Sequence, residues 1–392
     1  MIKVFEGALA KSYERSFLVR AGGKICPLKP VKTSPNWSSR VMDLLTSPWL
    51  FPITLLVFFW VAQVRPSALT LLLLYTSALF SAAFILLTKV DLDNLSVVNP
   101  WRLIFLLGAI MLVIGVVGFL LQITRVRGIP LLNEGLRRGL SPVLNYMAWT
   151  SVPGMAFILS SIRDVQRRRC LAITLAILGF IPSLFLAFRT EMIAYVLAIS
   201  LVLYRRNVIK GVHLLLGFLL SLALFVGVGA IRSITTGVAA QPVLSVLYRP
   251  TITVAALDTI VRRYNLYPVT HGLLHLAALS SLGLIRGSRY GPRTLISIYA
   301  LGRRDVSTTA TILGGPVLDA GLLGALFVVS LLSYLISLSY RASKRSDSLI
   351  GPYATLLSYT VVGVETGILD LNVYLYLLVA ALVTVLSLRP RR

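Results

Sequence analysis

The chain has 392 residues, of which 57% are hydrophobic and 13% are charged. This composition excludes an ordinary water-soluble domain and favours a polytopic membrane protein. The formal net charge is +24, which in a soluble protein would indicate a nucleic-acid partner. In a membrane protein the same charge indicates loops that face anionic lipid, so we expect membrane lipid and no nucleic acid as a partner.

Residues 1–47 are basic and hold no apolar core, which predicts a cytoplasmic N-terminal arm without a cleavable signal peptide. Ten apolar segments follow, several of them close to the roughly 20 residues that cross a hydrocarbon core. They predict an all-α polytopic membrane protein with about 10 transmembrane helices. The segments cover residues 48–64, 67–88, 101–123, 141–162, 170–188, 190–204, 211–231, 316–340, 351–366 and 371–388.

Two further apolar runs, at 250–261 and 268–285, lie between the seventh and eighth segments. They are expected to form re-entrant or interfacial helices, or two extra spans that would raise the number to 12. Pro250 and Pro268 are expected to open these helices, because proline suits the first helical turn.

The lysines predict the orientation of the chain. If the N-terminus is cytoplasmic, all eight lysines fall on the cytoplasmic side, where positive residues are enriched. Both termini are then inside the cell membrane, with residues 389–392 as a cytoplasmic tail. Residues 48–388 form the transmembrane domain, which includes residues 232–315 as a large outer loop.

The predicted outer loop contains nine arginines and no lysine. A guanidinium group presents paired donors that fit a phosphate, whereas an ammonium group does not. The loop therefore predicts a substrate with anionic groups, although arginines at span ends can also anchor in lipid headgroups. The candidate phosphate ligands on this face are Arg125, Arg127, Arg189, Arg232 and Arg289.

Three acidic residues are expected to support this site. Glu134 lies among the arginines of the 125–139 turn, and Glu191 follows Arg189, with which it is expected to form an ion pair. Asp319 lies inside the eighth segment, where an isolated carboxylate is unfavourable, so it is expected to face an arginine or a polar cavity. Gly321, with the other glycines of the 314–324 element, is expected to permit close helix approach.

His271 and His275 have the i, i+4 spacing that suits a metal ion on a helix. No cysteine or nearby carboxylate completes a ligand set, so no metal site is expected. Patterns for nucleotide or dinucleotide binding are also absent, so no cofactor is expected.

Four short elements together resemble the Wzy-type oligosaccharide repeat-unit (O-antigen) polymerases, and the archaeal members most closely. These elements are Arg127-Gly-Ile-Pro, Phe188-Arg189, Ile231-Arg232 and Gly315-Pro-Val-Leu-Asp-Ala-Gly-Leu-Leu-Gly. The large outer loop late in the chain belongs to the same resemblance, which covers most of residues 50–388.

The resemblance implies a GT-C-like membrane glycosyltransferase that uses neither a metal nor a nucleotide. The donor would be a glycan on a polyprenyl phosphate or diphosphate, and the acceptor a second lipid-linked repeat unit at the outer face. A flippase and a chain-length regulator are implied as partners. Arginines near the departing phosphate, Arg189 and Arg232 among them, would stabilise the charge that develops there.

Two other functions remain open on the sequence. An O-antigen-type ligase would use the same donor with a different acceptor. A lipid-linked oligosaccharide flippase or anion transporter would also need arginines, but it should show inverted repeats and charges near the middle of the membrane. The interiors of the predicted spans are nearly uncharged, which favours an enzyme with a site at one face.

The attacking sugar hydroxyl must lose a proton, and three outer residues could accept it. Glu134 and Glu191 lie beside arginines that would hold them ionised, which makes them poor bases. Histidine changes its charge near neutral pH. We therefore predict His271 as the proton acceptor, with the donor phosphate itself as the rival.

Overall fold

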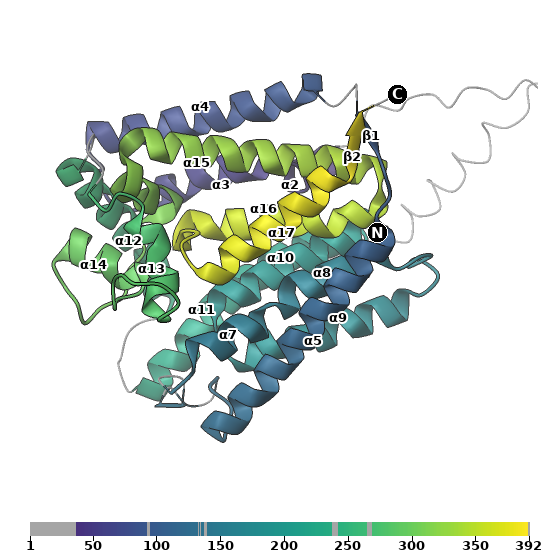
Figure 1. Ribbon diagram of the computed structural model, residues 1–392, viewed down its shortest axis with the longest axis horizontal. Coiled ribbons are helices and arrows are strands. Elements are labelled where there is room, and N and C mark those ends of the chain that lie inside the picture. Colours follow the sequence, from purple (N-terminus) through teal and green to yellow (C-terminus); the bar gives the residue numbers. More distant parts are fainter. Residues whose placement is uncertain are drawn as a thin grey trace, which may run out of the picture. The chain divides into compact units, whose positions relative to one another are not determined.

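The computed structural model describes residues 37–91, 95–131, 133, 135–136, 139–236, 242–264 and 269–390, and residues 42–392 form one unit. The described residues are mostly helical, with two short strands, which confirms the predicted all-α class. In Figure 1, α12, α13 and α14 lie at one end of this unit, and β1 and β2 lie at the other. The elements are α2 (Trp37–Leu45), α3 (Leu50–Val61), α4 (Ala68–Asp91), β1 (Leu95–Val97), α5 (Trp101–Val126), α7 (Pro142–Trp149), α8 (Ser151–Ser161), α9 (Arg169–Phe185), α10 (Arg189–Arg205), α11 (Gly211–Thr236), α12 (Pro242–Tyr264), α13 (Leu273–Ser281), α14 (Pro292–Leu301), α15 (Thr311–Arg345), η1 (Asp347–Leu349), α16 (Ile350–Thr366), α17 (Leu371–Leu386) and β2 (Leu388–Pro390).

Each of the ten predicted apolar segments is helical, although segment 141–162 contains two helices, α7 and α8. Large exposed apolar side chains, such as Trp60 at 85% exposure and Leu323 at 79%, suit a surface that faces lipid. These features support a membrane protein, whereas the number of spans stays a prediction. Among the described residues, three helices are long and apolar enough to cross a membrane: Ala68–Thr88, Trp101–Val126 and Thr311–Arg345.

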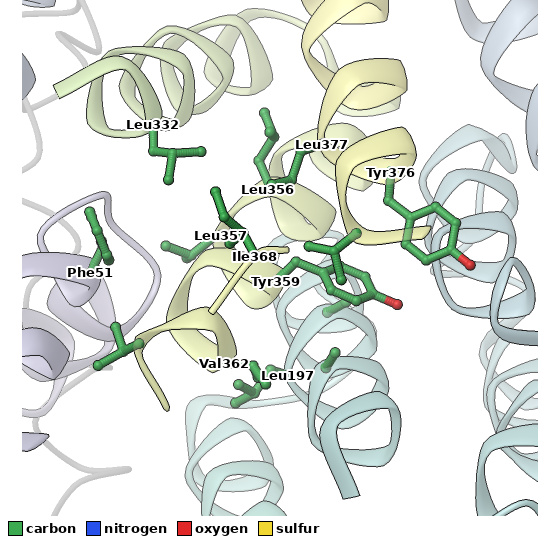
Figure 2. Packing of buried hydrophobic residues seen from close by; sticks show 14 of the residues in the cluster. Phe51, Leu197, Leu332, Leu356, Leu357, Tyr359, Val362, Ile368, Tyr376 and Leu377 are labelled. Carbon is green, nitrogen blue, oxygen red and sulfur yellow. The ribbon is translucent and has the colours of Figure 1, made fainter. Parts of the chain in front are cut away.

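The core is centred on α16, which packs against α3, α8, α10, α15 and α17. Nearly every residue of α16 is buried, as expected for a helix that is apolar on all faces. Tyr359 and Tyr376 are buried there, with their ring centroids 5.2 Å apart (Figure 2). Because α16 touches so many helices, it sets the positions of α10 and α17, which carry the polar site described below.

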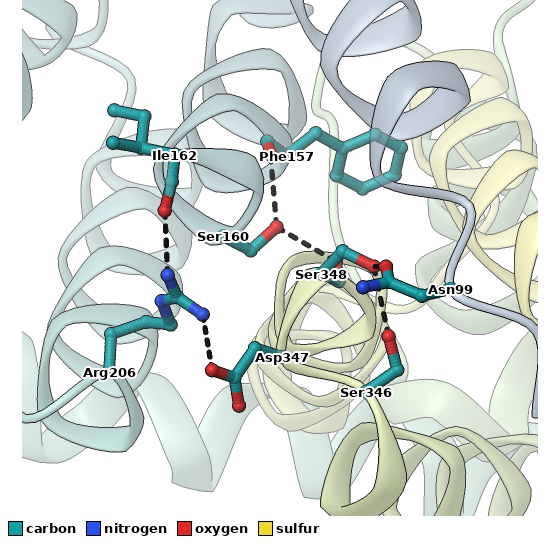
Figure 3. Close-up of polar contacts among 8 residues, drawn as sticks. All are labelled: Asn99, Phe157, Ser160, Ile162, Arg206, Ser346, Asp347 and Ser348. Atoms are coloured by element: carbon teal, nitrogen blue, oxygen red, sulfur yellow. Dashed lines mark hydrogen bonds and ion pairs between the residues drawn. The ribbon is translucent and has the colours of Figure 1, made fainter. Parts of the chain in front are cut away.

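The connections that the lysine pattern assigns to the cytoplasm contact one another. β1 pairs antiparallel with β2, with Ser96 opposite Arg389. Arg206, directly after α10, forms an ion pair of 2.5 Å with Asp347 and donates a hydrogen bond of 2.6 Å to the carbonyl of Ile162 (Figure 3). The loops after α4, α8, α10, α15 and α17 therefore meet at one end of the unit.

The connections predicted to lie outside also contact one another. Oδ1 of Asp258 in α12 accepts hydrogen bonds from the backbone N–H and the hydroxyl of Ser67 and from the hydroxyl of Thr70, at 2.6–2.7 Å. Burial alone would raise the pKa of Asp258, but these hydrogen bonds, together with Arg262, hold the pKa below its usual value. The ionised carboxylate therefore holds α12 against the turn between α3 and α4.

Prolines open two of the loop helices, but one of the two expected positions was wrong. Pro250 was expected to open a helix, but α12 begins earlier, at Pro242, and Pro250 lies inside it. The less apolar residues before Pro250 are helical as well. Pro292 occupies the first position of α14, where the missing N–H of proline has no helical partner to lose. Pro268 lies outside the described residues.

α15 is broken close to its start. Ala320 and Gly321 have non-helical backbone angles, and Gly321 has φ 68° and ψ −167°, a region that is essentially restricted to glycine. The role of Gly321 is therefore to permit this break, which corrects the expectation of close helix approach. Beside the break, the carbonyl of Leu318 accepts hydrogen bonds from the backbone N–H groups of Val269 and Thr270, at 2.8 and 3.1 Å.

Replacing Gly321 should disrupt this break. We expect Gly321→Ala to lower the free energy of unfolding by about 1–3 kcal/mol, because a Cβ atom is strained at these backbone angles. Gly227→Ala is the matched control, since Gly227 lies inside helical α11 with open space around its Cα. That control should be neutral or should stabilise the protein by up to about 1 kcal/mol. Denaturant unfolding of both variants in lipid nanodiscs measures the difference, and equal effects would contradict the assigned role.

Candidate functional site

Asp319 lies at the break in α15 and holds the outer loop there. Its Oδ1 accepts hydrogen bonds from the hydroxyl of Thr270 and from the backbone N–H groups of Gly272 and Leu274, the latter two at 3.1 Å. Its Oδ2 accepts from the backbone N–H of His275 at 2.9 Å and contacts Nδ1 of the same residue. Asp319 thus caps α13 from another helix. The sequence predicted an arginine or a polar cavity beside Asp319, and its partners are instead a histidine, a hydroxyl and backbone amides.

His275 is oriented by this contact. Its Nδ1–H points to the carboxylate, so Nε2 is left to accept a proton, which is the arrangement a general base requires. The side chain of His275 is 27% exposed, whereas that of Asp319 is 4% exposed. The ring of His275 also packs against Tyr374, with centroids 5.8 Å apart. His271, the histidine that the sequence favours, is exposed and has a left-handed φ of 47°.

A second polar group lies where the outer loop meets α16 and α17. Arg249 of α12 forms an ion pair of 2.8 Å with Glu365 at the end of α16. Arg293 of α14 forms an ion pair with Asp370, the residue before α17. Arg189 and Arg293 also lie close enough to Glu365 to act on its charge. With Glu191 these residues form the acid–arginine cluster: Arg189, Glu191, Arg249, Arg293, Glu365 and Asp370.

Glu191 is held by neutral donors. It lies in the first turn of α10 and is 3% exposed. Its Oε2 accepts a hydrogen bond of 2.5 Å from the hydroxyl of Tyr359, and its Oε1 accepts one of 3.1 Å from Nδ2 of Asn372. These contacts differ from the ion pair with Arg189 that the sequence suggested, because α16 and α17 bring their own polar groups to the start of α10.

Two of the guanidinium groups in the acid–arginine cluster are paired with carboxylates. Asp370 raises the pKa of Arg293 above its ordinary value through the attraction of opposite charges, and burial opposes this only in part. Arg293 therefore stays charged, and its charge is matched by its partner. Arg249 and Arg293, each paired with a carboxylate, therefore have little net attraction for a further anion.

A cavity of about 230 Å³ adjoins this cluster. The first residues of four helices surround it, at Pro142 of α7, Thr190 of α10, Arg293 of α14 and Asp370 before α17. Helix N-termini carry partial positive charge, which stabilises carboxylates placed beside them. The lining residues are Pro142, Asn145, Tyr146, Trp149, Phe188, Thr190, Glu191, Arg293 and Asp370.

The other predicted site residues are placed as follows. Arg125 lies in the last turn of α5, and Arg127 ends that helix with a left-handed φ of 52°; both are exposed. Arg289 is exposed between α13 and α14. Among the described residues, the cavity lining includes none of these three. Glu134 and the side chain of Arg232 lie outside the described part of the chain.

Sequence reasoning missed Glu365 and Asp370, and it did not single out their partners Arg249 and Arg293. A signal was available, since Glu365 lies at the end of the ninth apolar segment and Asp370 lies in the short connection to the tenth. The predicted orientation puts that connection on the same side as the arginine-rich loop. Across the ranges that the structure describes, no three His, Cys, Asp or Glu residues are arranged to hold a metal ion.

The pair of Arg293 and Asp370 should couple more strongly than an exposed pair. In a double-mutant cycle with Arg293→Ala and Asp370→Ala, we expect a coupling energy of about 1–3 kcal/mol in unfolding, because both side chains are largely buried. The matched control is Arg303 with Asp305, whose side chains are 60% and 67% exposed. The exposed pair should show a much smaller coupling, since solvent screens it. Similar couplings for the two pairs would mean that Arg293 and Asp370 do not fix α14 on α17.

Comparison with known proteins places the sequence of this chain in a family. A family model described as putative O-antigen polymerase matches residues 44–377. An uncharacterized protein of Methanocaldococcus jannaschii, MJ0419, is 27% identical over 292 residues, which are 74% of this chain and 78% of that protein. No solved structure matches. The match supports a membrane glycosyltransferase that polymerises oligosaccharide repeats, with lipid-linked oligosaccharides as substrates. The chain belongs to the putative O-antigen polymerase family.

Proposed function

We propose that this chain joins lipid-linked oligosaccharide repeat units at the outer face of the cell membrane, with a polyprenyl phosphate or diphosphate as the leaving group. One observation carries the proposal: loop arginines and the Asp319-bound His275 meet the ends of the helices at one end of the unit. A transporter needs polar groups along a path through the membrane. A site at one end suits an enzyme whose substrates lie at one surface.

In the proposed reaction, a sugar hydroxyl of one lipid-linked glycan attacks the anomeric carbon of another. The bond from that carbon to the phosphate oxygen breaks, and its electron pair leaves with the phosphate. The hydroxyl proton passes to Nε2 of His275, and Asp319 stabilises the imidazolium that forms, as a buried carboxylate does beside an Nδ1–H group. His271 is the alternative acceptor of this proton, and no metal or cofactor is required.

The departing phosphate needs positive charge that is not already matched. Arg125, Arg127 and Arg289 are exposed and can offer both donors of the guanidinium fork to a phosphate. Arg189 and Arg232 are proposed as further ligands, as the family resemblance implies, with Glu134 as a supporting acid. Arg189 also belongs to the acid–arginine cluster, where it acts on the charge of Glu365.

Lysine should not replace the phosphate-binding arginines. Arg127→Lys, Arg189→Lys and Arg232→Lys keep the charge but lose the paired donors, so polymer formation should fall more than tenfold in each, equivalent to about 1.4 kcal/mol of activation free energy. Arg303→Lys is the control, because Arg303 is exposed and pairs with its neighbour Asp305. Near-parental rates for all three variants would show that these arginines only anchor the chain in lipid headgroups.

The two histidines can be separated by a matched pair of variants. If His275 accepts the proton, His275→Ala should lower the rate of polymerisation at least a hundredfold, whereas His271→Ala should stay within a few-fold of the parent. The assay uses purified protein and lipid-linked repeat units, with donor binding measured separately. The reverse result would assign the role to His271. Two near-parental variants would leave the phosphate as the proton acceptor.

The proposed architecture is a GT-C-like fold with about 10 spans, a cytoplasmic arm at residues 1–47, a catalytic domain at 48–388 and a cytoplasmic tail at 389–392. Its orientation predicts that an impermeant thiol reagent labels Leu284→Cys on intact cells but does not label Arg345→Cys. Both changes are made in a background without Cys26 and Cys170. Leu284 is 66% exposed in the outer loop, so accessibility does not limit it. Labelling of the second site alone would reverse the orientation.

Mass analysis of lipid-linked glycans, with and without the gene, tests the proposed function. Loss of chains longer than one repeat unit is expected for a polymerase. Accumulation of complete chains that remain on the lipid would instead identify a ligase, which uses the same donor with another acceptor. If neither the chain lengths nor the amount of complete lipid-linked chains changes, both the polymerase and the ligase are contradicted.

A further inference from the structure

The cavity beside the acid–arginine cluster has an aromatic wall. Tyr146 and Trp149 come from α7, and Phe188 precedes α10. The ring centroids of Tyr146 and Trp149 lie 5.7 Å apart, and those of Trp149 and Phe188 lie 4.7 Å apart. Aromatic rings grouped in this way offer a rigid apolar surface with a few polar atoms at its edge. Such a surface suits the C–H faces of a sugar ring.

The polar groups of the cavity are held in place by hydrogen bonds and an ion pair. Oδ1 of Asn145 accepts a hydrogen bond of 3.0 Å from Nε2 of Gln122, so Nδ2 is the group left to donate to a ligand. Glu191 is held by its two neutral donors, and Asp370 is held by Arg293. Preorganised donors and acceptors of this kind recognise hydroxyl groups without paying to order the side chains first.

The indole N–H of Trp149 is a further donor on this wall. Trp149 is 8% exposed, and within the described ranges its Nε1–H has no hydrogen-bond partner. A buried donor without a partner lowers stability by about 1–3 kcal/mol. An acceptor brought to this wall, such as a sugar oxygen, would remove that penalty.

The charge and the size of the cavity narrow the choice of ligand. Two acidic side chains line it, Glu191 and Asp370, and Arg293, the guanidinium group among the described lining residues, is already paired with Asp370. A phosphate or a uronic acid would therefore meet acidic side chains, and the partial positive charge of the surrounding helix N-termini already faces these acids. The volume of about 230 Å³ is below the roughly 300–1,000 Å³ of pockets for drug-sized ligands. It suits one ring rather than a chain of rings.

We propose that this cavity binds a single uncharged pyranose ring of the lipid-linked glycan. The proposal rests on the proposed function for the source of the sugar, and it separates two tasks within the site. The ring lies against Tyr146, Trp149 and Phe188, with its hydroxyls on Asn145 and Glu191. The phosphate lies outside the cavity, on exposed arginines such as Arg127 and Arg289.

The test is saturation-transfer NMR with the purified full chain in nanodiscs, or in a detergent without a sugar head group. The probes are methyl pyranosides of neutral hexoses and N-acetylhexosamines, compared with methyl glucuronide. We expect at least one neutral pyranoside to bind, and methyl glucuronide to bind at least tenfold more weakly. Equal binding of neutral and anionic sugars, or no binding of any neutral probe, overturns the proposal.

Two conservative variants locate the binding. Trp149→Phe and Thr190→Val should each weaken the neutral pyranoside at least threefold, because one removes the indole N–H and the other removes a lining hydroxyl. The matched controls are Trp60→Phe and Thr76→Val, which make the same changes on α3 and α4 away from the cavity. Thermal unfolding checks that the variants are folded. Equal affinity in cavity and control variants also overturns the proposal.

The outcome is distinguishable from failure of the proposed function. If the chain binds neutral sugars at the cavity but makes no polymer, the sugar-binding proposal is supported and the polymerase proposal is contradicted. If the chain makes polymer but its cavity variants change neither sugar binding nor the choice of substrate, the polymerase proposal is supported and the sugar-binding proposal is contradicted.

Discussion

The site depends on the hydrogen bonds between the carboxylate of Asp319 and the start of α13. This carboxylate lies where α15 breaks, and it accepts hydrogen bonds from the hydroxyl of Thr270 and the backbone at the start of α13. Held at this point, the outer loop delivers His275 in one orientation, with its accepting nitrogen turned away from the acid. Only glycine permits the backbone break beside Asp319, so Gly321 belongs to the same device.

Positive charge in the outer loop has two uses. Arg249 and Arg293 pair with Glu365 and Asp370, so they bind the loop to the ends of α16 and α17. Exposed arginines such as Arg289 have no such structural duty among the contacts described above, and they suit a phosphate. This division explains why the cavity itself, with two carboxylates at its wall, fits a sugar ring better than an anion.

Much of the architecture could be read from local sequence. Apolar runs of helical length predicted the helices, and the lysine pattern predicted which connections meet at each end. The site was harder, because its partners are far apart in the chain. His275 and Asp319 are 44 positions apart, Arg293 and Asp370 are 77 apart, and Glu191 and Tyr359 are 168 apart. The two histidines look alike in sequence, and only one of them reaches a carboxylate.

By itself the sequence determined the helical class, the family and the arginine-rich composition of residues 232–315. These follow from composition and short motifs, which are properties of neighbouring residues. Only the tertiary structure decided that Glu191 is held by Tyr359 and Asn372, that Asp319 caps α13, and that four helix N-termini surround one cavity. The physical reason is that a carboxylate bonds to whichever donors the packing of distant helices brings within hydrogen-bonding distance.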